Sequence, residues 1–153
     1  MMKKGNLIQW LTWAAIVVLL VGCAIFVMDS MNYHFRGYGE RYYHKNQLEL
    51  EAYCARVFEE NDRDCNLEYD GMRVAYHRDA GMLEFDTGGS GLGSETSYWG
   101  FYYSATGKPV GFQGSPVDFT ETEDGYYWKE PDGDNWQKSK ELAPHWFTYE
   151  AHF

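Results

Sequence analysis

Residues 72–85, MRVAYHRDAGMLEF, predict two adjacent β-strands. Val74 and Tyr76 occupy every second position of the first run, as do Leu83 and Phe85 in the second, and a period of two is typical of a strand with one buried face. The Arg-Asp-Ala-Gly sequence between the runs supplies the small and polar residues of a tight turn. We therefore expect an antiparallel hairpin here.

More strands are expected downstream of this hairpin. Aromatic and β-branched residues recur there between turn-forming residues, which is typical of an antiparallel meander. The expected strands are residues 98–103, 110–113, 117–122, 126–129 and 145–152. Residues 87–93, TGGSGLG, are expected to form a flexible connection, because glycine and serine favour flexible linkers.

Upstream of the hairpin, apolar residues recur at helical spacing. Tyr43, Leu50, Cys54 and Val57 are separated by seven, four and three positions, which predicts one amphipathic helix over residues 38–60. One helix followed by an antiparallel meander is an α+β arrangement in which the helix covers one face of the sheet. We therefore expect a single α+β domain over residues 38–153.

The amino-terminal part of the chain predicts a membrane anchor. Residues 7–28 carry no charged side chain, and about 20 apolar residues are enough for a helix to cross a bilayer. We expect a transmembrane signal-anchor there, after cytoplasmic residues 1–6 and before a tether at residues 29–37. The domain would then be extracytoplasmic in a single-pass protein, with the membrane and a cell-envelope glycan or protein as partners.

Two forms of processing are alternatives to a retained anchor. Leu20-Val21-Gly22-Cys23 resembles the lipobox of bacterial lipoproteins. The resemblance implies that Cys23 is acylated and that the preceding peptide is removed. Ordinary signal-peptide cleavage near Cys23 also fits the small residues around it. All three alternatives place the folded domain outside the cytoplasm.

Charge argues against one class of partner. The 153 residues include 13 Lys and Arg against 23 Asp and Glu, for a formal net charge of −10. Without Lys3 and Lys4, which precede the expected anchor, 11 basic residues remain against the same 23 acidic ones, or −12. Binding to nucleic acid requires a basic surface, so a nucleic-acid partner is not expected.

Beyond Cys23, the sequence contains one pair of cysteines, Cys54 and Cys65. An even number of cysteines in a domain outside the cytoplasm predicts a disulfide, which would tie the helix to the following strand. The alternative is that Cys54, on the apolar stripe of the helix, is a buried thiol. The cysteines and histidines lack the close spacing of a metal site, so no metal or other cofactor is expected.

One motif suggests catalysis. Phe85-Asp86-Thr87-Gly88 resembles the catalytic loop of aspartic peptidases. The resemblance implies that Asp86 is a catalytic carboxylate, paired in a homodimer with its copy in a second chain. The alternative is that Asp86 ends a strand. Glu84 and Asp86 also share one face of that strand, but acid–base catalysis by such a pair requires a cleft.

Aromatic residues suggest a binding surface. Residues 99–110, WGFYYSATGKPV, resemble the aromatic hairpin of choline-binding cell-wall repeats, with a looser echo in residues 125–136. The resemblance implies a cage for a quaternary ammonium group, formed by Trp99, Tyr102, Tyr127 and Trp128. Separately, surface aromatics could stack on sugar rings while nearby polar residues bind the hydroxyls, and the residues suited to this are Trp128, Trp136 and Trp146, near Asp132, Asp134 and Asn135. Alternatively, consecutive aromatics place one ring on each face of the sheet, and the inward ring belongs to the core.

No complete catalytic constellation is present in the sequence. We therefore expect a non-catalytic accessory or binding module held at a membrane, with choline-type or carbohydrate binding and the Asp86 peptidase as alternatives.

Overall fold

The structure is a computed structural model that describes residues 13–24, 37–92 and 95–153. The chain divides into two compact units, Met1–Tyr33 and His34–Phe153.

In the first unit, residues 13–24 are helical. Among the residues that the structure describes, no helix is both long enough and apolar enough to span a bilayer. The expected anchor at residues 7–28 lies partly outside the described residues. The expected cytoplasmic residues 1–6 and nearly all of the tether at residues 29–37 also lie outside them.

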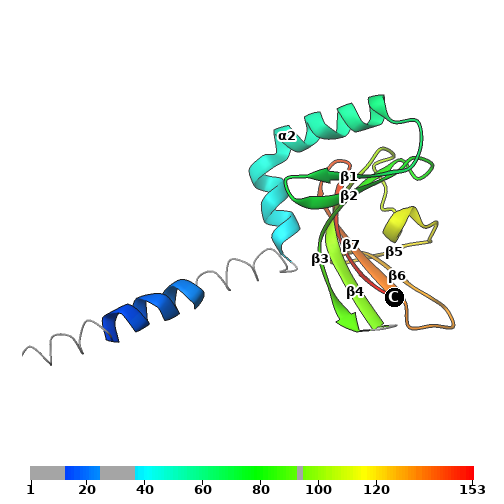
Figure 1. Ribbon diagram of the computed structural model, residues 1–153. Coiled ribbons are helices and arrows are strands. Elements are labelled where there is room, and N and C mark those ends of the chain that lie inside the picture. The colour runs from blue at the N-terminus through cyan, green and yellow to red at the C-terminus, as the bar shows by residue number, and fades with distance from the viewer. Residues whose placement is uncertain (1–12, 25–36, 93–94) are drawn as a thin grey trace, which may run out of the picture. The chain divides into compact units, whose positions relative to one another are not determined.

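The second unit is an α+β domain with one long helix and an eight-stranded antiparallel sheet (Figure 1). The helix α2 is Tyr38–Glu60, the range that the apolar spacing predicts. The strands are β1 (Cys65–Tyr69), β2 (Met72–His77), β3 (Met82–Leu92), β4 (Glu95–Ser104), β5 (Thr120–Thr122), β6 (Gly125–Lys129), β7 (Trp136–Ala143) and β8 (Trp146–His152). A short 3₁₀ turn, η1 (Phe112–Gly114), lies between β4 and β5.

The sheet consists of two four-stranded meanders joined side by side. The strand order is β1-β2-β3-β4-β8-β7-β6-β5, so β4 of the first meander pairs with β8 of the second. The expected hairpin at residues 72–85 is confirmed, with Val74 opposite Phe85 and Tyr76 opposite Leu83. Because residues directly opposite each other in a sheet project from the same face, this register extends one apolar surface across β2, β3 and β4.

Helix α2 covers that apolar surface. Its first half packs against β4 and β8 through Tyr43, whose ring centroid lies 5.0 Å from that of Trp146. Its second half packs against β1 and β3 through Tyr53, whose ring lies 4.4 Å from Tyr69 and 6.1 Å from Phe85. Between the halves, Asn46 has non-helical dihedrals, and Figure 1 shows the helix changing direction along its length. The bend lets one helix cover strands from both meanders.

The opposite face of the sheet carries a second apolar core, under the connection from β4 to β5. Phe112 of η1 packs there against a buried cluster that includes Met82, Tyr102, Phe147 and Tyr149. This connection was expected to contain a strand at residues 110–113, and that prediction is wrong. The apolar residues in it serve to cover the sheet rather than to extend it.

Strand β7 was not expected, because its inward side chains are polar. Gln137 is 1% exposed. Both the oxygen and the nitrogen of its side-chain amide form hydrogen bonds with the backbone of the β4–β5 connection. Its Oε1 accepts a hydrogen bond from the N–H of Phe112 at 2.6 Å, and its Nε2 donates to the carbonyl oxygen of Val110 at 3.1 Å. These bonds satisfy polar groups that the connection would otherwise bury without partners.

Two further expectations are corrected. Residues 87–93 were expected to be a flexible connection, but residues 87–92 continue β3 and pair with β4 after a register shift at Asp86 and Gly88. Pairing with β4 fixes these glycines, and at Gly91 a Cβ atom would lie 2.1 Å from the carbonyl oxygen of Glu95. The expected strand at residues 117–122 is reduced to β5, Thr120–Thr122.

The expected disulfide is absent from the structure, where Cys54 and Cys65 are free thiols. Cys54 is 3% exposed on the inner face of α2, as the alternative of a buried thiol predicts. Cys65 instead has its Sγ 3.5 Å from the side-chain oxygen of Asn61, at the end of α2. The two sulfurs therefore have different local partners, one in the core and one at its edge.

Candidate functional site

The largest site that we consider is a groove of about 600 Å³ on the face of the sheet that α2 partly covers. Its floor is a row of cross-strand neighbours, in which Trp99 of β4 is opposite Glu150 of β8, Glu150 is opposite Lys138 of β7, and Lys138 is opposite Tyr127 of β6. Residues in such a row project from the same face. The sheet register therefore places four side chains of different chemistry side by side.

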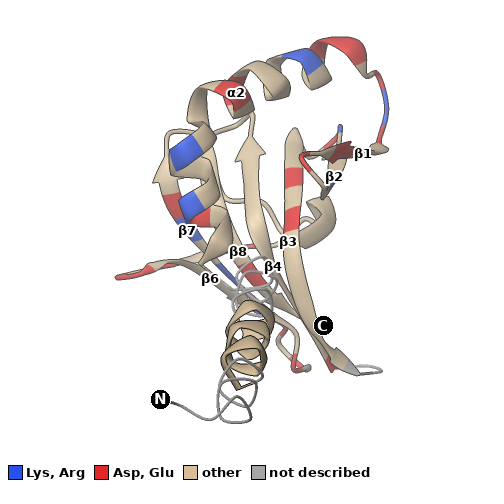
Figure 2. Cartoon of the chain, turned by 60° about the vertical axis from the view of Figure 1, so that its left-hand side comes forward, with Lys and Arg blue, Asp and Glu red and all other residues tan. Residues whose placement is uncertain are grey.

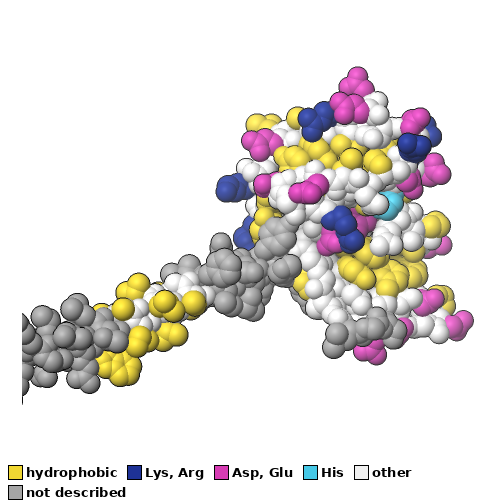
Figure 3. All heavy atoms as spheres, in the orientation of Figure 1, with side chains coloured by type: hydrophobic (Ala, Val, Ile, Leu, Met, Phe, Trp, Pro, Cys, Tyr) yellow, Lys and Arg dark blue, Asp and Glu magenta, His cyan; other side chains and the backbone are white. Residues whose placement is uncertain are grey.

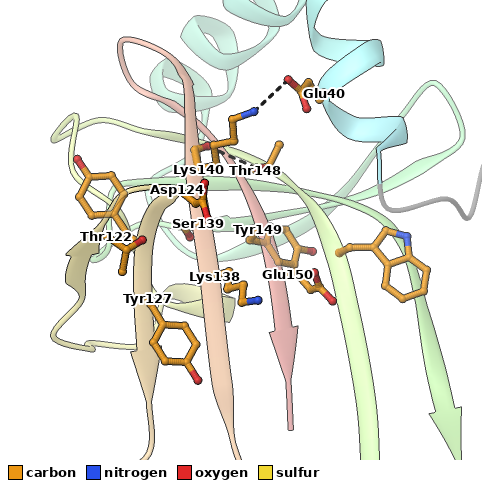
Figure 4. Close-up of a pocket in the computed structure, with 12 residues that line it drawn as sticks. Glu40, Thr122, Asp124, Tyr127, Lys138, Ser139, Lys140, Thr148, Tyr149 and Glu150 are labelled. Carbon is orange, nitrogen blue, oxygen red and sulfur yellow. Dashed lines mark hydrogen bonds and ion pairs between the residues drawn. The ribbon is translucent and has the colours of Figure 1, made fainter.

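The rim of the groove connects the sheet to α2. Lys140 Nζ lies 3.5 Å from Glu40 Oε1 in the first turn of the helix, and Figure 4 shows this pair at the helix end of the groove. Both side chains are largely in solvent, 59% and 43% exposed, so the pair contributes little to stability. Thr148 also lines this end and donates its hydroxyl hydrogen to the carbonyl oxygen of Lys140 at 3.4 Å.

Carboxylates, ammonium groups and hydroxyls alternate along the groove. Asp124 and Thr122 line its β5–β6 end, where Figure 4 also shows Tyr127. Lys138 Nζ lies 5.4 Å from the ring centroid of Trp136, a cation–π arrangement that holds the ammonium group at the floor. With Glu40, Glu150 and Lys140, the groove contains three acidic and two basic side chains. Its charge is therefore nearly balanced.

The structure brings together only two of the four aromatics expected to bind a ligand. Trp99 and Tyr127 line the groove, where Tyr127 is partly exposed but Trp99 is only 6% exposed and belongs to the core. Tyr102 is fully buried in the second core, where its hydroxyl donates to Ser139 Oγ at 3.2 Å and accepts from the N–H of Val110 at 3.1 Å. Trp128 lies beside Phe153 on that same opposite face, with the rings 6.4 Å apart.

Beneath the groove, the buried tyrosines are neutral at physiological pH. Burial is the main reason that the pKa of Tyr149 lies well above its usual value, and the nearby carboxylate of Glu84 raises it further. Burial also raises the pKa of Tyr102 to about 12, although its two hydrogen bonds oppose the shift. These residues support the site through packing, as neutral phenols.

Asp86 lies within β3, on the face opposite the groove. Its Oδ2 forms an ion pair with Arg73, and its Oδ1 accepts a hydrogen bond from the N–H of Gly88 at 2.9 Å. Thr87 is buried and donates to the carbonyl oxygen of Trp99 at 3.1 Å. This strand setting differs from the loop that the peptidase resemblance implies.

A second cavity, of about 470 Å³, is lined by both Cys54 of α2 and His145 of the β7–β8 turn. The Nδ1 of His145 lies 2.8 Å from the carbonyl oxygen of Ser104, a geometry in which Nδ1 carries the hydrogen and donates it. Burial strongly raises the pKa of the Cys54 thiol, and Glu51 adds to the effect. A protonated thiol is a poor nucleophile, so this pair does not form a catalytic dyad.

Within residues 13–24, 37–92 and 95–153, no group of three His, Cys, Asp or Glu side chains could hold a metal ion. Cys23, the residue expected to carry a lipid in the lipoprotein alternative, is exposed in the helical segment of the first unit.

The sequence alone did not identify the charged residues of the groove. In β7 the exposed Lys138 and Lys140 alternate with the buried Gln137 and Ser139. Because all four side chains are polar, this alternation of exposure is not visible as an alternation of apolar and polar residues. Glu40 reaches the groove from a helix about a hundred residues upstream of Lys140, and only the fold brings the two together. Comparison with protein-family models, with curated proteins and with solved structures finds no match for this chain.

Proposed function

We propose that the domain is a non-catalytic binding module that holds a neutral glycan in the groove over Tyr127. The observation that carries the proposal is the cross-strand row of Trp99, Glu150, Lys138 and Tyr127, which places aromatic rings next to donors and acceptors in one open groove.

The chemistry of the groove suits sugar rings. A pyranose has an apolar face that stacks on aromatic side chains and a belt of hydroxyls, each of which both donates and accepts hydrogen bonds. Ammonium groups such as that of Lys138 only donate, and ionised carboxylates such as those of Glu150 and Asp124 only accept. A groove that offers both types, with nearly balanced charge, complements a neutral polyhydroxylated ligand better than an ionic one.

The same composition argues against a choline-type ligand. A quaternary ammonium group is held by several converging aromatic rings and donates no hydrogen bond. Here Tyr102 and Trp128 lie on the opposite face of the sheet, and Lys138 and Lys140 add positive charge to the groove. The four rings of the expected cage are therefore not assembled in the groove.

The glycan proposal predicts saturable binding of neutral oligosaccharides by the purified full chain. Cellohexaose, chitohexaose and xylohexaose are suitable probes for isothermal titration calorimetry. We expect at least one to bind, and we expect Tyr127→Ala to weaken it by about tenfold, because loss of one stacking ring removes roughly 0.5–1.5 kcal/mol beyond the buried area.

Trp128→Ala provides the matched control, because it removes a half-buried aromatic from the opposite face. Binding should survive this change. Undiminished binding in Tyr127→Ala, or loss of binding in Trp128→Ala alone, would place the ligand elsewhere. Elution of the chain by choline chloride from a choline matrix would favour the choline alternative, and failure of all neutral oligosaccharides to bind would reject the glycan.

We further propose that residues 7–28 hold this module at a membrane, with the domain on the outer side. The support is the sequence, since the segment is uncharged over its full length and two lysines precede it. An outer location would also give an acidic glycan-binding domain direct access to the cell envelope.

The cysteines provide a test of this orientation. Cys65 is partly exposed and Cys54 is buried, so a membrane-impermeant maleimide should label a Cys23→Ser variant in intact cells at Cys65 alone. Cys65→Ser in the same background should abolish the label. Labelling that requires permeabilised cells would contradict the outer location. Incorporation of a fatty-acid analogue that depends on Cys23 would support the lipoprotein alternative over a retained anchor.

A further inference from the structure

A third cavity, of about 250 Å³, lies on the face of the sheet opposite the groove. Strands β1, β2 and β3 form its floor, where Asn66 is opposite Ala75 and Ala75 is opposite Glu84, and η1 closes one side. We call this cavity the Glu84 pocket, lined by the polar side chains of Asn66, Arg73, His77, Glu84, Asp86 and Gln113. Figure 2 shows acidic residues within β3, and Figure 3 shows acidic, basic and histidine side chains gathered on one face of the domain.

The two carboxylates of the pocket differ in how their charge is balanced. Asp86 pairs with the guanidinium of Arg73, so its charge is neutralised by a neighbour. The side chain of Glu84 is only 6% exposed, and its Oε2 accepts a hydrogen bond from the backbone N–H of Gln113 at 3.0 Å. A backbone N–H carries no full charge, and a buried carboxylate that lacks a cationic partner is costly.

His77 is the other group that could balance Glu84. Its Nε2 lies 3.6 Å from Glu84 Oε2, beyond hydrogen-bonding distance, and it is buried with no hydrogen-bond partner within the described part of the chain. The imidazole is charged only when it is protonated. In the neutral form, an Nε2 that carries no hydrogen can offer a second acceptor beside the carboxylate.

The remaining lining groups add to this acceptor-rich character. Asn66 and Gln113 each carry a side-chain carbonyl oxygen, and Arg73 is turned toward Asp86. With His77 neutral, the formal charge of the pocket is −1, from Glu84 and Asp86 against Arg73. A small ligand that carries one positive charge and several N–H donors would complement both the charge and the hydrogen-bonding pattern.

We propose that the Glu84 pocket binds the primary ammonium group of a small molecule or side chain, with Glu84 as its counter-ion and His77 Nε2 as a further acceptor. An ammonium group has three donors and no acceptor, which matches a site of acceptors with net negative charge. The inference is independent of the glycan site, because the two cavities lie on opposite faces of the sheet and share no lining residue.

The test uses methylammonium chloride as the probe and ¹⁵N-labelled full chain at pH 8. The backbone N–H of Gln113 donates to Glu84, so its resonance should shift in a saturable way as methylammonium is added. Tetramethylammonium chloride at equal concentration is the control for non-specific screening of this acidic protein, because it carries the same charge but no N–H donor. It should not produce the shift.

Variants separate the site from the rest of the acidic surface. Glu84→Gln keeps the shape and an oxygen for the Gln113 N–H but removes the charge, and we expect it to weaken binding by about tenfold or more. Glu121→Gln removes one charge from the exposed strand β5 and should leave binding unchanged. If Glu84→Gln is poorly folded, Asn66→Leu serves instead, since Asn66 is exposed on β1 and a leucine there would replace one polar wall.

Equal shifts with methylammonium and tetramethylammonium would overturn the proposal. So would a saturable methylammonium shift that persists undiminished in both Glu84→Gln and Asn66→Leu, or the absence of any saturable shift at Gln113 in the parent chain.

Discussion

Trp146→Ala is expected to lower the free energy of unfolding by about 3–5 kcal/mol, the range for removal of a fully buried large aromatic. Trp146 is 2% exposed at the point where α2 crosses the junction of the two meanders. Its ring lies 5.0 Å from that of Tyr43, 5.4 Å from Tyr103, and 6.1 Å from both Phe85 and Phe101. Removing it opens a cavity that touches the helix and both halves of the sheet.

Chemical denaturation, followed by far-ultraviolet circular dichroism, measures this effect. Trp136→Ala is the matched control, because Trp136 is half-buried at the edge of β7 and contacts mainly His152 and Lys138. We expect that control to cost about 1 kcal/mol, since partly exposed side chains lose less contact on truncation. Equal destabilisation by the two substitutions would show that Trp146 does not occupy a central position in the core.

Gly100→Ala is expected to lower the free energy of unfolding by about 3 kcal/mol or more, although it adds a single methyl group. A Cβ atom at position 100 would lie 2.1 Å from the carbonyl oxygen of Phe85 and 2.8 Å from Cε1 of Tyr149. The first contact is with the backbone of the adjacent strand β3, which cannot move without breaking the pairing between β3 and β4. Overpacking a rigid site usually costs about 1–3 kcal/mol and occasionally more, and the backbone contact puts this position at the upper end.

Soluble yield and the thermal unfolding midpoint, compared with the parent chain, measure the effect of Gly100→Ala. Gly37→Ala is its control, because the nearest atom to a new Cβ there is the end of the flexible Arg41 side chain at 3.1 Å. That variant should unfold close to the parent temperature. A Gly100→Ala protein with a midpoint matching that of Gly37→Ala would contradict the close approach of β3, β4 and Tyr149.

Local sequence patterns predicted those elements that have one apolar and one polar side. The spacing of Tyr43, Leu50, Cys54 and Val57 predicted α2 with its observed bounds. The alternation in residues 72–85 predicted the β2–β3 hairpin. One strong signal was missed: Asp70 and Gly71 both have positive φ, 49° and 74°, in the turn between β1 and β2, and Asp-Gly is a preferred pair for such a hairpin turn.

The candidate sites were harder to predict, because they depend on register between distant strands. Trp99 and Tyr127 were singled out for their ring chemistry, but only pairing through β8 and β7 places them in one row. Tyr102 has similar ring chemistry but is buried on the opposite face, because side chains alternate between the two faces along β4 and Tyr102 is three positions from Trp99. Glu84 and Asp86 were recognised as sharing a face, whereas the cavity beside them requires η1, which the sequence did not predict.

The β5 edge of the sheet also affects how the protein behaves when many copies are crowded together. The outermost strand β5 has only three residues, Thr120–Thr122, all of them exposed, and Glu121, Glu123 and Asp124 surround it with negative charge. A short acidic edge is a poor template for another chain, because like charges repel and few backbone groups are available to pair. Copies concentrated on one surface should therefore resist edge-to-edge polymerisation through β5 and remain separate.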